Sequence, residues 1–199
     1  MTNMDSEAQD TQDMARLAAG HDAALNELME RHGEKLFHYL IRCLQNEEEA
    51  ADLAQETFVR VYQHRARFDS GQKFSTWLYT IASNLVRDRY RWRARHPQIS
   101  LNAEHEETGT ELGARLAHPG ASPRESLKTT ERVTAVQNAM AALPEELRAP
   151  LILAEYEDKP QAEIAQILSW SVKAVETRIY RARKQLRTAL GFLLGQGGA

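Results

Sequence analysis

The sequence predicts an all-α protein in which two helical domains are joined by a flexible linker. First, apolar residues recur at steps of three and four along most of the chain, which is the spacing of a helix face. Second, no stretch alternates apolar and polar residues as a half-buried strand does. Third, one segment, residues 97–125, has no apolar period and holds three Pro, three Gly and five Glu. We therefore expect helical domains at 10–96 and 126–191, with 97–125 as an acidic, flexible linker.

The N-terminal domain is predicted from three periodic stretches. Residues 23–44 carry an apolar stripe at helical spacing, with a break expected near Gly33. Residues 46–68 follow, and there Asn46 can cap the helix start while three Glu in the first turn favour the helix dipole. Residues 75–95 form the last periodic stretch, again with apolar residues on one side.

The C-terminal domain is predicted to be a run of helices separated by proline. A helix over 131–143 is followed by one that Pro144 can start, because proline suits the first turn of a helix. A short helix begins at Pro160, and residues 169–171 connect it tightly to a last helix over 171–187. A short helix, a brief turn and a second amphipathic helix form the helix-turn-helix pattern.

Composition indicates a globular protein in a reducing compartment. The chain has 199 residues, of which 42% are apolar and 27% charged, with a formal net charge of −3. The N-terminal residues are polar and acidic, so no secretory signal is expected. No apolar run reaches the roughly 18 residues that span a membrane. A cytoplasmic location without membrane insertion is therefore expected, and the single cysteine, Cys43, excludes an intrachain disulfide framework.

Nothing in the sequence indicates catalysis. The seven histidines form no tight ligand pair on a predicted helix face, and one cysteine adds little to them. The chain also has no grouping of a nucleophile with a base and no phosphate-binding loop. We expect no metal, no cofactor and no enzymatic activity.

Positive charge is concentrated in residues 171–187, which hold six Lys or Arg and one Glu in a mildly acidic protein. Val175, Ile179 and Ala182 belong to an apolar stripe, and the basic residues lie elsewhere on the cylinder. One hypothesis is a recognition helix in the DNA major groove, with Lys and Arg neutralising phosphates. The alternative is a solvated basic face on a packed terminal helix.

Residues 87–95 form a second basic patch, in which five Arg are interleaved with two aromatic residues. This pattern suits single-stranded nucleic acid, because positive charge follows the backbone while rings stack on bases. Upstream, Phe68, Phe74 and Trp77 surround a predicted loop. The alternative is that the aromatic residues belong to the core and that the arginines form a solubilising helix end.

An acidic surface is expected on the second predicted helix. Residues 46–56 include five acidic residues and no basic one. Asp52, Gln55 and Glu56 fall off the apolar stripe and should be exposed, and Glu56 can pair with Arg60 one turn later. Without further information, a solvated face is the default interpretation of such a cluster.

Two long stretches resemble a known family. "DLAQETFVRVYQHRARFDSGQKFSTWLYTIASNLVRDRYRWRAR" is similar to region 2 of bacterial sigma factors of the extracytoplasmic-function group. "ALPEELRAPLILAEYEDKPQAEIAQILSWSVKAVETRIYRARKQLR" is similar to their region 4. The resemblance covers roughly residues 20 to 190, and its specific parts are "DLAQETF", "FSTWLYTIASN" and "TRIYRARKQL", in that order. It implies an alternative sigma factor, which binds core RNA polymerase and directs transcription initiation at specific promoters.

For the first domain, the resemblance implies two binding surfaces. Asp52, Gln55 and Glu56 match positions that dock on the clamp helices of the RNA polymerase β′ subunit. Asn84 matches a residue lining a pocket for a flipped base of the minus-10 promoter element, and residues 68–74 match the loop that shapes this pocket. The expected minus-10 contacts are Phe68, Phe74, Trp77, Asn84, Arg87 and Arg91.

For the second domain, the resemblance implies a helix that reads the minus-35 element, and a contact with the polymerase β flap. The expected DNA contacts are Lys173, Glu176, Thr177, Arg178, Tyr180, Arg181 and Arg183. Of these, Lys173, Arg178 and Arg183 are expected at phosphates or as structural partners. Glu176 stands where relatives often carry Lys or Arg, and its carboxylate can accept from a cytosine amino group. The helix start, "SVKAV", also departs from the more usual "PVGTV".

Control by an anti-sigma factor is a further implication of the resemblance. The competing hypothesis is a stand-alone helix-turn-helix regulator, with residues 10–96 as a sensor or dimerisation domain. "DLAQE" and "FSTWLYTIASN" favour the sigma factor, because a repressor has no need of them.

Overall fold

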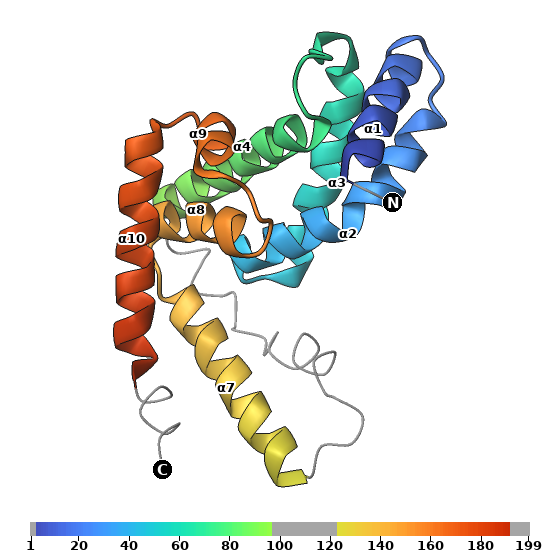
Figure 1. Ribbon diagram of the computed structural model, residues 1–199. Helices are drawn as coiled ribbons and strands as arrows, with labels where there is room; N and C mark the ends of the chain where they lie inside the picture. Colours follow the sequence, from blue (N-terminus) through green and yellow to red (C-terminus); the bar gives the residue numbers. More distant parts are fainter. Residues whose placement is uncertain (1–2, 97–122, 192–199) are drawn as a thin grey trace.

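The computed structural model describes residues 3–96 and 123–191, and all of the regular structure in these two stretches is helical (Figure 1). The predicted all-α class is therefore confirmed. Most of the predicted linker, residues 97–122, lies outside the described residues. None of the described helices is long and apolar enough to cross a membrane.

The N-terminal block consists of four α-helices and one turn of 3₁₀-helix. These are α1 (Asn3–Ala18), α2 (Ala24–Leu44), α3 (Glu47–Gln63), η1 (Arg65–Arg67) and α4 (Phe74–Arg95). Helix α2 packs against α1, α3 and α4, so its apolar stripe lies in the middle of the block. Leu28, Leu36 and Leu40 of this stripe are fully buried.

Helix α2 is continuous through Gly33, so the break that we expected there is wrong. A glycine inside a helix costs about 1 kcal/mol relative to alanine. Leu28 and Leu36 on either side are fully buried, and burying a leucine contributes about 1.5–3 kcal/mol. The tertiary contacts of the neighbouring residues therefore outweigh the weak helix preference of Gly33.

Helix α3 begins where the sequence predicts. The Asn46 side chain accepts a hydrogen bond from the Glu49 backbone N–H at 2.8 Å, which caps the helix. Glu47, Glu48 and Glu49 occupy the first turn, where negative charge favours the helix dipole.

The C-terminal block contains the other four described helices. These are α7 (Pro123–Ala141), α8 (Glu145–Glu155), α9 (Gln161–Leu168) and α10 (Val172–Ala189). Pro144 and Pro160 directly precede α8 and α9 as expected. Helix α7 starts eight residues before the predicted 131–143 helix and includes the last three residues of the predicted linker. The added residues have no apolar period, so the spacing of apolar residues could not predict that the helix begins this early.

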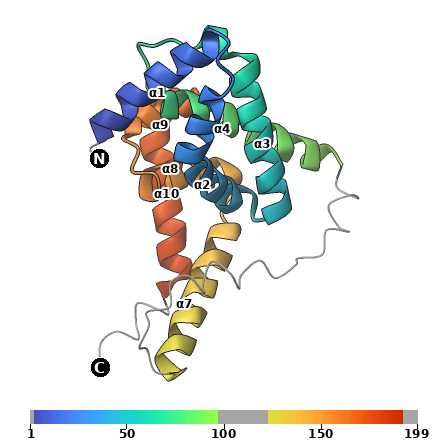
Figure 2. The same cartoon turned by 90° about the vertical axis from the view of Figure 1, so that its right-hand side faces the viewer.

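The two blocks pack against each other. Helix α9 runs alongside α4, and α8 lies against α2, while α10 forms one edge of the molecule (Figures 1 and 2). The buried apolar residues form one continuous cluster that extends from α1 to α10. The described helices thus share a single core in spite of the sequence boundary between the blocks.

Substitution of Gly33 by Ala is expected to stabilise the protein by about 1 kcal/mol, because nothing lies within 4 Å of an added Cβ. Equilibrium urea unfolding followed by circular dichroism measures the change. Gly20→Ala is the control: Gly20 has φ +93°, so the same added methyl should destabilise the protein there. Equal effects at the two positions would contradict this account of α2.

Candidate polymerase and nucleic-acid surfaces

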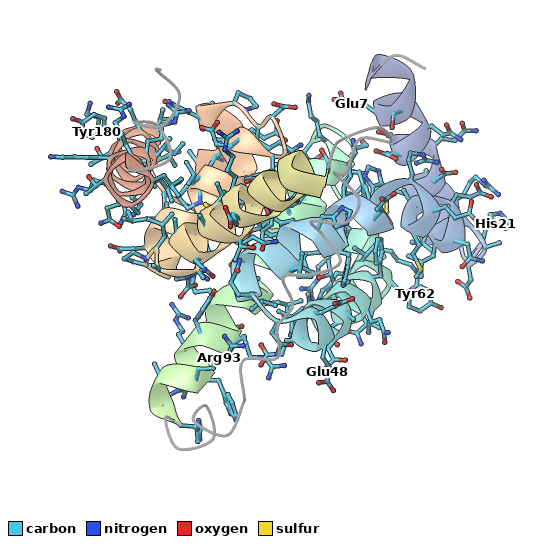
Figure 3. The ribbon with its side chains drawn as sticks, turned by 90° about the horizontal axis from the view of Figure 1, so that it is seen from below. Glu7, His21, Glu48, Tyr62, Arg93 and Tyr180 are labelled. Carbon is cyan, nitrogen blue, oxygen red and sulfur yellow. The ribbon has the colours of Figure 1, made fainter. Side chains whose placement is uncertain are left out.

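The acidic surface predicted on α3 faces outwards. Asp52 and Gln55 are exposed, and Glu56 forms the predicted ion pair with Arg60 at 2.8 Å. Glu48, one turn earlier, also points away from the molecule (Figure 3). Glu49, by contrast, turns back towards α4, where it binds Arg93. Asp52 and Gln55, two of the three residues for which the family resemblance implies a partner, are therefore exposed, while the third, Glu56, is paired with Arg60 of its own helix.

The three aromatic residues predicted around the loop at 68–73 form one cluster. The Phe68 ring lies 5.3 Å from Trp77 and 6.1 Å from Phe74, measured between centroids. Phe74 is only 2% exposed and belongs to the core, whereas Phe68 and Trp77 are half-buried. Phe74 is therefore the buried member of the cluster. The rings of Phe68 and Trp77 are partly exposed, so they are the ones on which a base could stack.

Helix α4 places the predicted minus-10 residues on one narrow face. Trp77, Asn84 and Arg91 are seven residues apart, and two turns of a helix bring such residues above one another. Asn84 and Arg91 are exposed. Arg87 lies at the edge of this face and donates to Asn84 Oδ1 at 3.3 Å. The Asn84 amide is thus exposed and oriented by a neighbouring cation.

The arginine-rich end of α4 is divided between the core and the surface. Tyr90 donates to the Cys43 carbonyl and is half-buried, and burial raises the pKa of its phenol to about 12. Trp92 is 37% exposed and stacks on His96 at 4.8 Å. Arg93 is bound by Glu49. Of the aromatic residues in this patch, Trp92 alone presents its ring to solvent, and Figure 3 shows this end of α4 extending beyond the other helices.

The helix-turn-helix pattern is present in α9 and α10. Ser169 adopts the left-handed conformation, with φ 56°, and ends α9. Ser171 then caps α10 by accepting a hydrogen bond from the Ala174 N–H at 3.2 Å. Ile164 and Leu168 of α9 are buried, as are Val175 and Ile179 of α10. The departure from the family's usual "PVGTV" therefore leaves the helix start intact, because serine is itself a good N-cap.

The outer face of α10 is free and polar. Tyr180 is 67% exposed and projects from the edge of the molecule (Figure 3). Arg181 and Glu176 are also exposed, and Thr177 is half-buried. Glu176 accepts from Lys173 at 2.9 Å, so its carboxylate is partly neutralised by its own helix. These four residues are among the minus-35 contacts that the family resemblance implies, a role that stays a prediction.

Besides Lys173 and Glu176, which pair with each other, two of the predicted minus-35 contacts have partners outside α10. The Arg178 guanidinium lies 4.4 Å from the centroid of the Trp170 ring, and Arg183 Nε donates to Glu155 at 2.9 Å. Both residues hold α10 to the rest of its block. Their contacts are those of structural partners, while a contact of either residue with phosphate stays a prediction.

The predicted site residues lie on three separate surfaces of the described helices. No group of three or more His, Cys, Asp or Glu that could hold a metal occurs within the described stretches. The predicted residues lie on α3, on α4 with its preceding loop, and on α10. They are brought together within each surface, but the three surfaces are distinct.

Sequence reasoning missed the charged residues between the blocks. Arg148 is 8% exposed and donates to carbonyls of both blocks, including Cys43 O at 2.7 Å. The signal was present, because Arg148 interrupts the apolar run "LRAPLIL". Glu145, one turn earlier, lies near Arg148 and Arg87, and burial raises its pKa to about 7 in spite of these cations.

Comparison with known proteins gives a consistent result. The model of Sigma-70 region 2 matches residues 28–96, and that of Sigma-70 region 4 matches residues 134–186. The ECF RNA polymerase sigma factor SigW of Bacillus subtilis is 34% identical over 172 residues, which cover 86% of this chain and 91% of that protein.

Two solved structures share the fold. CnrH, a sigma factor of Cupriavidus metallidurans, was solved in complex with the cytosolic domain of CnrY. It superposes with a TM-score of 0.63 at 28% identity and covers 96% of this chain and 99% of that one. The sigma factor RpoE of Bartonella quintana, solved in complex with the anti-sigma factor NepR, gives a TM-score of 0.66 at 21% identity. It covers 83% of this chain and 96% of that one.

Substitution of Ser171 by Ala is expected to lower the free energy of unfolding by about 1 kcal/mol, because it removes the cap of α10. Urea unfolding of the full chain measures the loss. Ser171→Asp keeps a side-chain acceptor at the helix start, so its stability should equal that of the unchanged protein. A Ser171→Ala variant of unchanged stability would show that this cap does not stabilise α10.

Proposed function

The chain belongs to the extracytoplasmic-function group of RNA polymerase sigma factors, and from this premise we propose how its surfaces divide the work of initiation. The α3 surface binds the clamp helices of the polymerase β′ subunit. The α4 surface and the loop before it bind the minus-10 element, and α10 reads the minus-35 element. The protein adds binding specificity to the polymerase and catalyses no reaction itself.

The observation that carries the proposal is that acidic side chains are exposed on α3, whereas basic side chains are exposed on α4 and α10. Asp52 and Gln55 on α3 present acceptors to a protein partner, whereas α4 and α10 present arginines on other faces. Acidic side chains repel phosphate, and arginine binds it. One chain with an acidic protein-binding surface and two basic DNA-binding surfaces suits a subunit that joins an enzyme to two DNA elements.

At the minus-10 element, the Asn84 amide is the proposed reader of an extruded base. An amide offers both a donor and an acceptor, so it can pair with the edge of a base. Phe68 and Trp77 provide the rings against which such a base can stack. Arg91 is exposed and has only a solvated ion pair with Asp88 at 3.7 Å, so it can turn to the adjacent phosphate. Arg87 can do so once it leaves its internal acceptors.

At the minus-35 element, Tyr180 and Arg181 are the proposed central contacts of α10. Arg181 can donate two hydrogen bonds to guanine, which is the commonest specific contact in the major groove. Glu176 can accept from the amino group of cytosine. We expect the pair of Glu176 and Lys173 to open on binding, so that the carboxylate turns to the base and the ammonium to a phosphate.

An anti-sigma factor is the proposed regulatory partner, and the cytoplasm is the proposed location. CnrH, which shares the fold over nearly the whole chain, was solved with the cytosolic domain of another protein bound to it. The polymerase and its promoters lie in the same compartment. The stand-alone regulator is set aside, because region 2 of the sigma factors matches residues 28–96 and a repressor has no use for it.

Reversal of charge at Asp52, in Asp52→Arg, is expected to weaken binding to core polymerase by about tenfold, which corresponds to about 1.4 kcal/mol. Competition with a labelled sigma factor for purified core measures the affinity. Glu30→Arg makes the same change of charge at an exposed site of α2 and should leave the affinity unchanged. Equal losses in both variants would show that net charge, rather than the α3 surface, determines binding.

Replacement of Asn84 by Ala is expected to slow promoter opening by about tenfold or more while core binding stays within about twofold. Permanganate footprinting of a supercoiled promoter measures the open fraction. Asn138→Ala removes the same amide from an exposed position of α7 and serves as the control. If Asn84→Ala lost core binding to the same extent as promoter opening, the assignment of Asn84 to the minus-10 base would be wrong.

Arg181→Ala is expected to reduce the free energy of binding to the minus-35 element by about 1–3 kcal/mol. It should also weaken the preference for one particular base pair in that element. Binding of holoenzyme to promoters with single changes in this element gives both quantities. Arg132→Ala on α7 is the charge-matched control. A uniform loss across all minus-35 sequences would instead place Arg181 at a phosphate.

A further inference from the structure

Helix α1 contributes to none of the surfaces proposed above, and it ends before residue 28, where the match to region 2 begins. It is nevertheless firmly packed, because Met14 and Leu17 on its inner side are at most 1% exposed. Besides α2, it contacts η1 and α4, which lie directly before and after the loop at 68–73 (Figure 1). This is the loop that is proposed to shape the pocket for the minus-10 base. Helix α1 is therefore placed to support that loop from the protein side.

Buried charges fix the position of α1 on α2. Asp10 and Asp13 of α1 are 2% and 3% exposed. His32 Nε2 lies 2.9 Å from both carboxylate oxygens of Asp10. Arg31 binds Asp10 through Nη1 and Asp13 through Nη2. A buried carboxylate is strongly unfavourable without such partners, so a shift of α1 along or around its axis would leave charges unpaired. The cluster thus defines one docking position for α1.

The same histidine supports the aromatic cluster beside the loop. The centroid of the His32 ring lies 5.1 Å from that of the Phe74 ring, with 58° between the ring planes. Phe74 is the first residue of α4, and its ring packs on those of Phe68 and Trp77. These are the two rings against which an extruded base is proposed to stack. His32 therefore binds α1 through a ring nitrogen and supports the stacking rings through Phe74.

An ion pair joins α1 to the loop itself. Lys73 Nζ lies 2.7 Å from Glu7 Oε1, and this contact raises the pKa of Lys73. Between α1 and the loop is an open space of about 430 Å³, lined by Glu7, Ala8 and Thr11 on one side and by residues 70–73 on the other. The ion pair, rather than close packing, connects the two segments here. Both side chains are partly exposed, so the pair contributes little to global stability.

The loop forms a compact turn that the ion pair can hold. Asp69 Oδ1 accepts from the Gly71 N–H at 2.9 Å, and Asp69 O accepts from the Gln72 N–H at 3.1 Å. Lys73 ties one end of this turn to α1, and η1, before the other end, contacts α1 directly. The loop is thus connected to α1 on both sides of the turn. A segment held in this way loses little conformational entropy when a base enters the pocket.

We propose that α1 positions the minus-10 loop for the extruded base. Glu7 holds the loop through Lys73, and His32, which α1 binds, supports the stacking rings. The inference rests on the proposed function, because it concerns the pocket assigned there. A loop held in one shape favours the base that fits it, whereas a loose loop can adjust to several bases. Loss of either contact should therefore weaken discrimination at the minus-10 element more than it weakens core binding.

Charge exchange between Glu7 and Lys73 tests whether α1 holds the loop. A spin label on Ser70→Cys, at an exposed position of the loop, reports the motion of the loop in the free protein by electron resonance. Native Cys43 should not take the label, because it is 1% exposed and burial raises its pKa to about 12. Glu7→Lys and Lys73→Glu each place like charges together and are expected to make the label more mobile. The combined variant should restore the original mobility.

The same charge variants, without the label, are compared as holoenzymes on promoters that differ only at the base expected to be extruded. Each single variant is expected to reduce the ratio of promoter opening between the preferred base and the others by about threefold. Affinity for core polymerase should stay within about twofold. Glu27→Lys makes the same change of charge at an exposed site of α2 and should leave the ratio unchanged.

Unchanged label mobility in both single variants would contradict the hold of α1 on the loop. Higher mobility with an unchanged ratio would contradict its role in minus-10 recognition. A combined variant that restores the mobility but not the ratio would show that Lys73 acts on DNA by itself and not through Glu7. Promoter opening by the unchanged protein tests the proposed function separately. Its absence would contradict that function, while the label, measured without polymerase or DNA, would still decide whether α1 holds the loop.

Two variants of His32 separate its two contacts. His32→Phe keeps a ring against Phe74 but removes a partner of Asp10, so it is expected to lower the free energy of unfolding and to keep the ratio. His32→Gln keeps an amide donor for Asp10 but removes the ring, so it is expected to reduce the ratio by about threefold with little loss of stability. Urea unfolding and promoter opening measure the two effects. A ratio that falls in step with stability in both variants would contradict a positioning role for His32.

Discussion

The burial of α4 on two sides is the constraint on which the other features depend. Tyr79 and Ser83 turn towards Tyr39 of α2, where the two tyrosine rings meet edge to face at 5.1 Å and the Tyr39 hydroxyl lies 2.8 Å from Ser83 Oγ. Helix α9 covers an adjoining side. A helix enclosed in this way retains one narrow exposed strip, and Asn84 and Arg91 occupy it. The position of the proposed minus-10 surface thus follows from packing as much as from the residues that form it.

The same helix also holds part of the C-terminal block, through Arg87 and Leu168. A residue such as Arg87 can satisfy its guanidinium with a carbonyl of α9 or with a phosphate of DNA, and it cannot do both fully. Arg148 donates to Cys43 O at 2.7 Å and Tyr79 donates to Glu157 at 2.6 Å, so charged, hydrogen-bonded groups join the blocks beside their shared apolar core.

The sequence predicted local structure well and long-range contacts poorly. Periodicity and capping rules predicted the cap at Asn46 and the ion pair of Glu56 with Arg60, because each contact joins residues three or four positions apart. Helix α2 continues through Gly33 because the neighbouring residues are buried by other helices, and rules based on nearby residues do not include such tertiary contacts. Arg148 and Cys43 are 105 positions apart, and no pattern links them. The binding surfaces come from the family resemblance and stay predictions, whereas the packing of the two blocks on each other was not predicted at all.

The measurement that tests the central claim most directly is multi-round transcription of fragmented genomic DNA from the host, with purified core polymerase, in the presence and absence of this protein. The account predicts discrete new start sites that share two upstream elements, found only when the protein is present. Binding of DNA without polymerase, together with no new transcripts, would contradict it and would favour a stand-alone regulator.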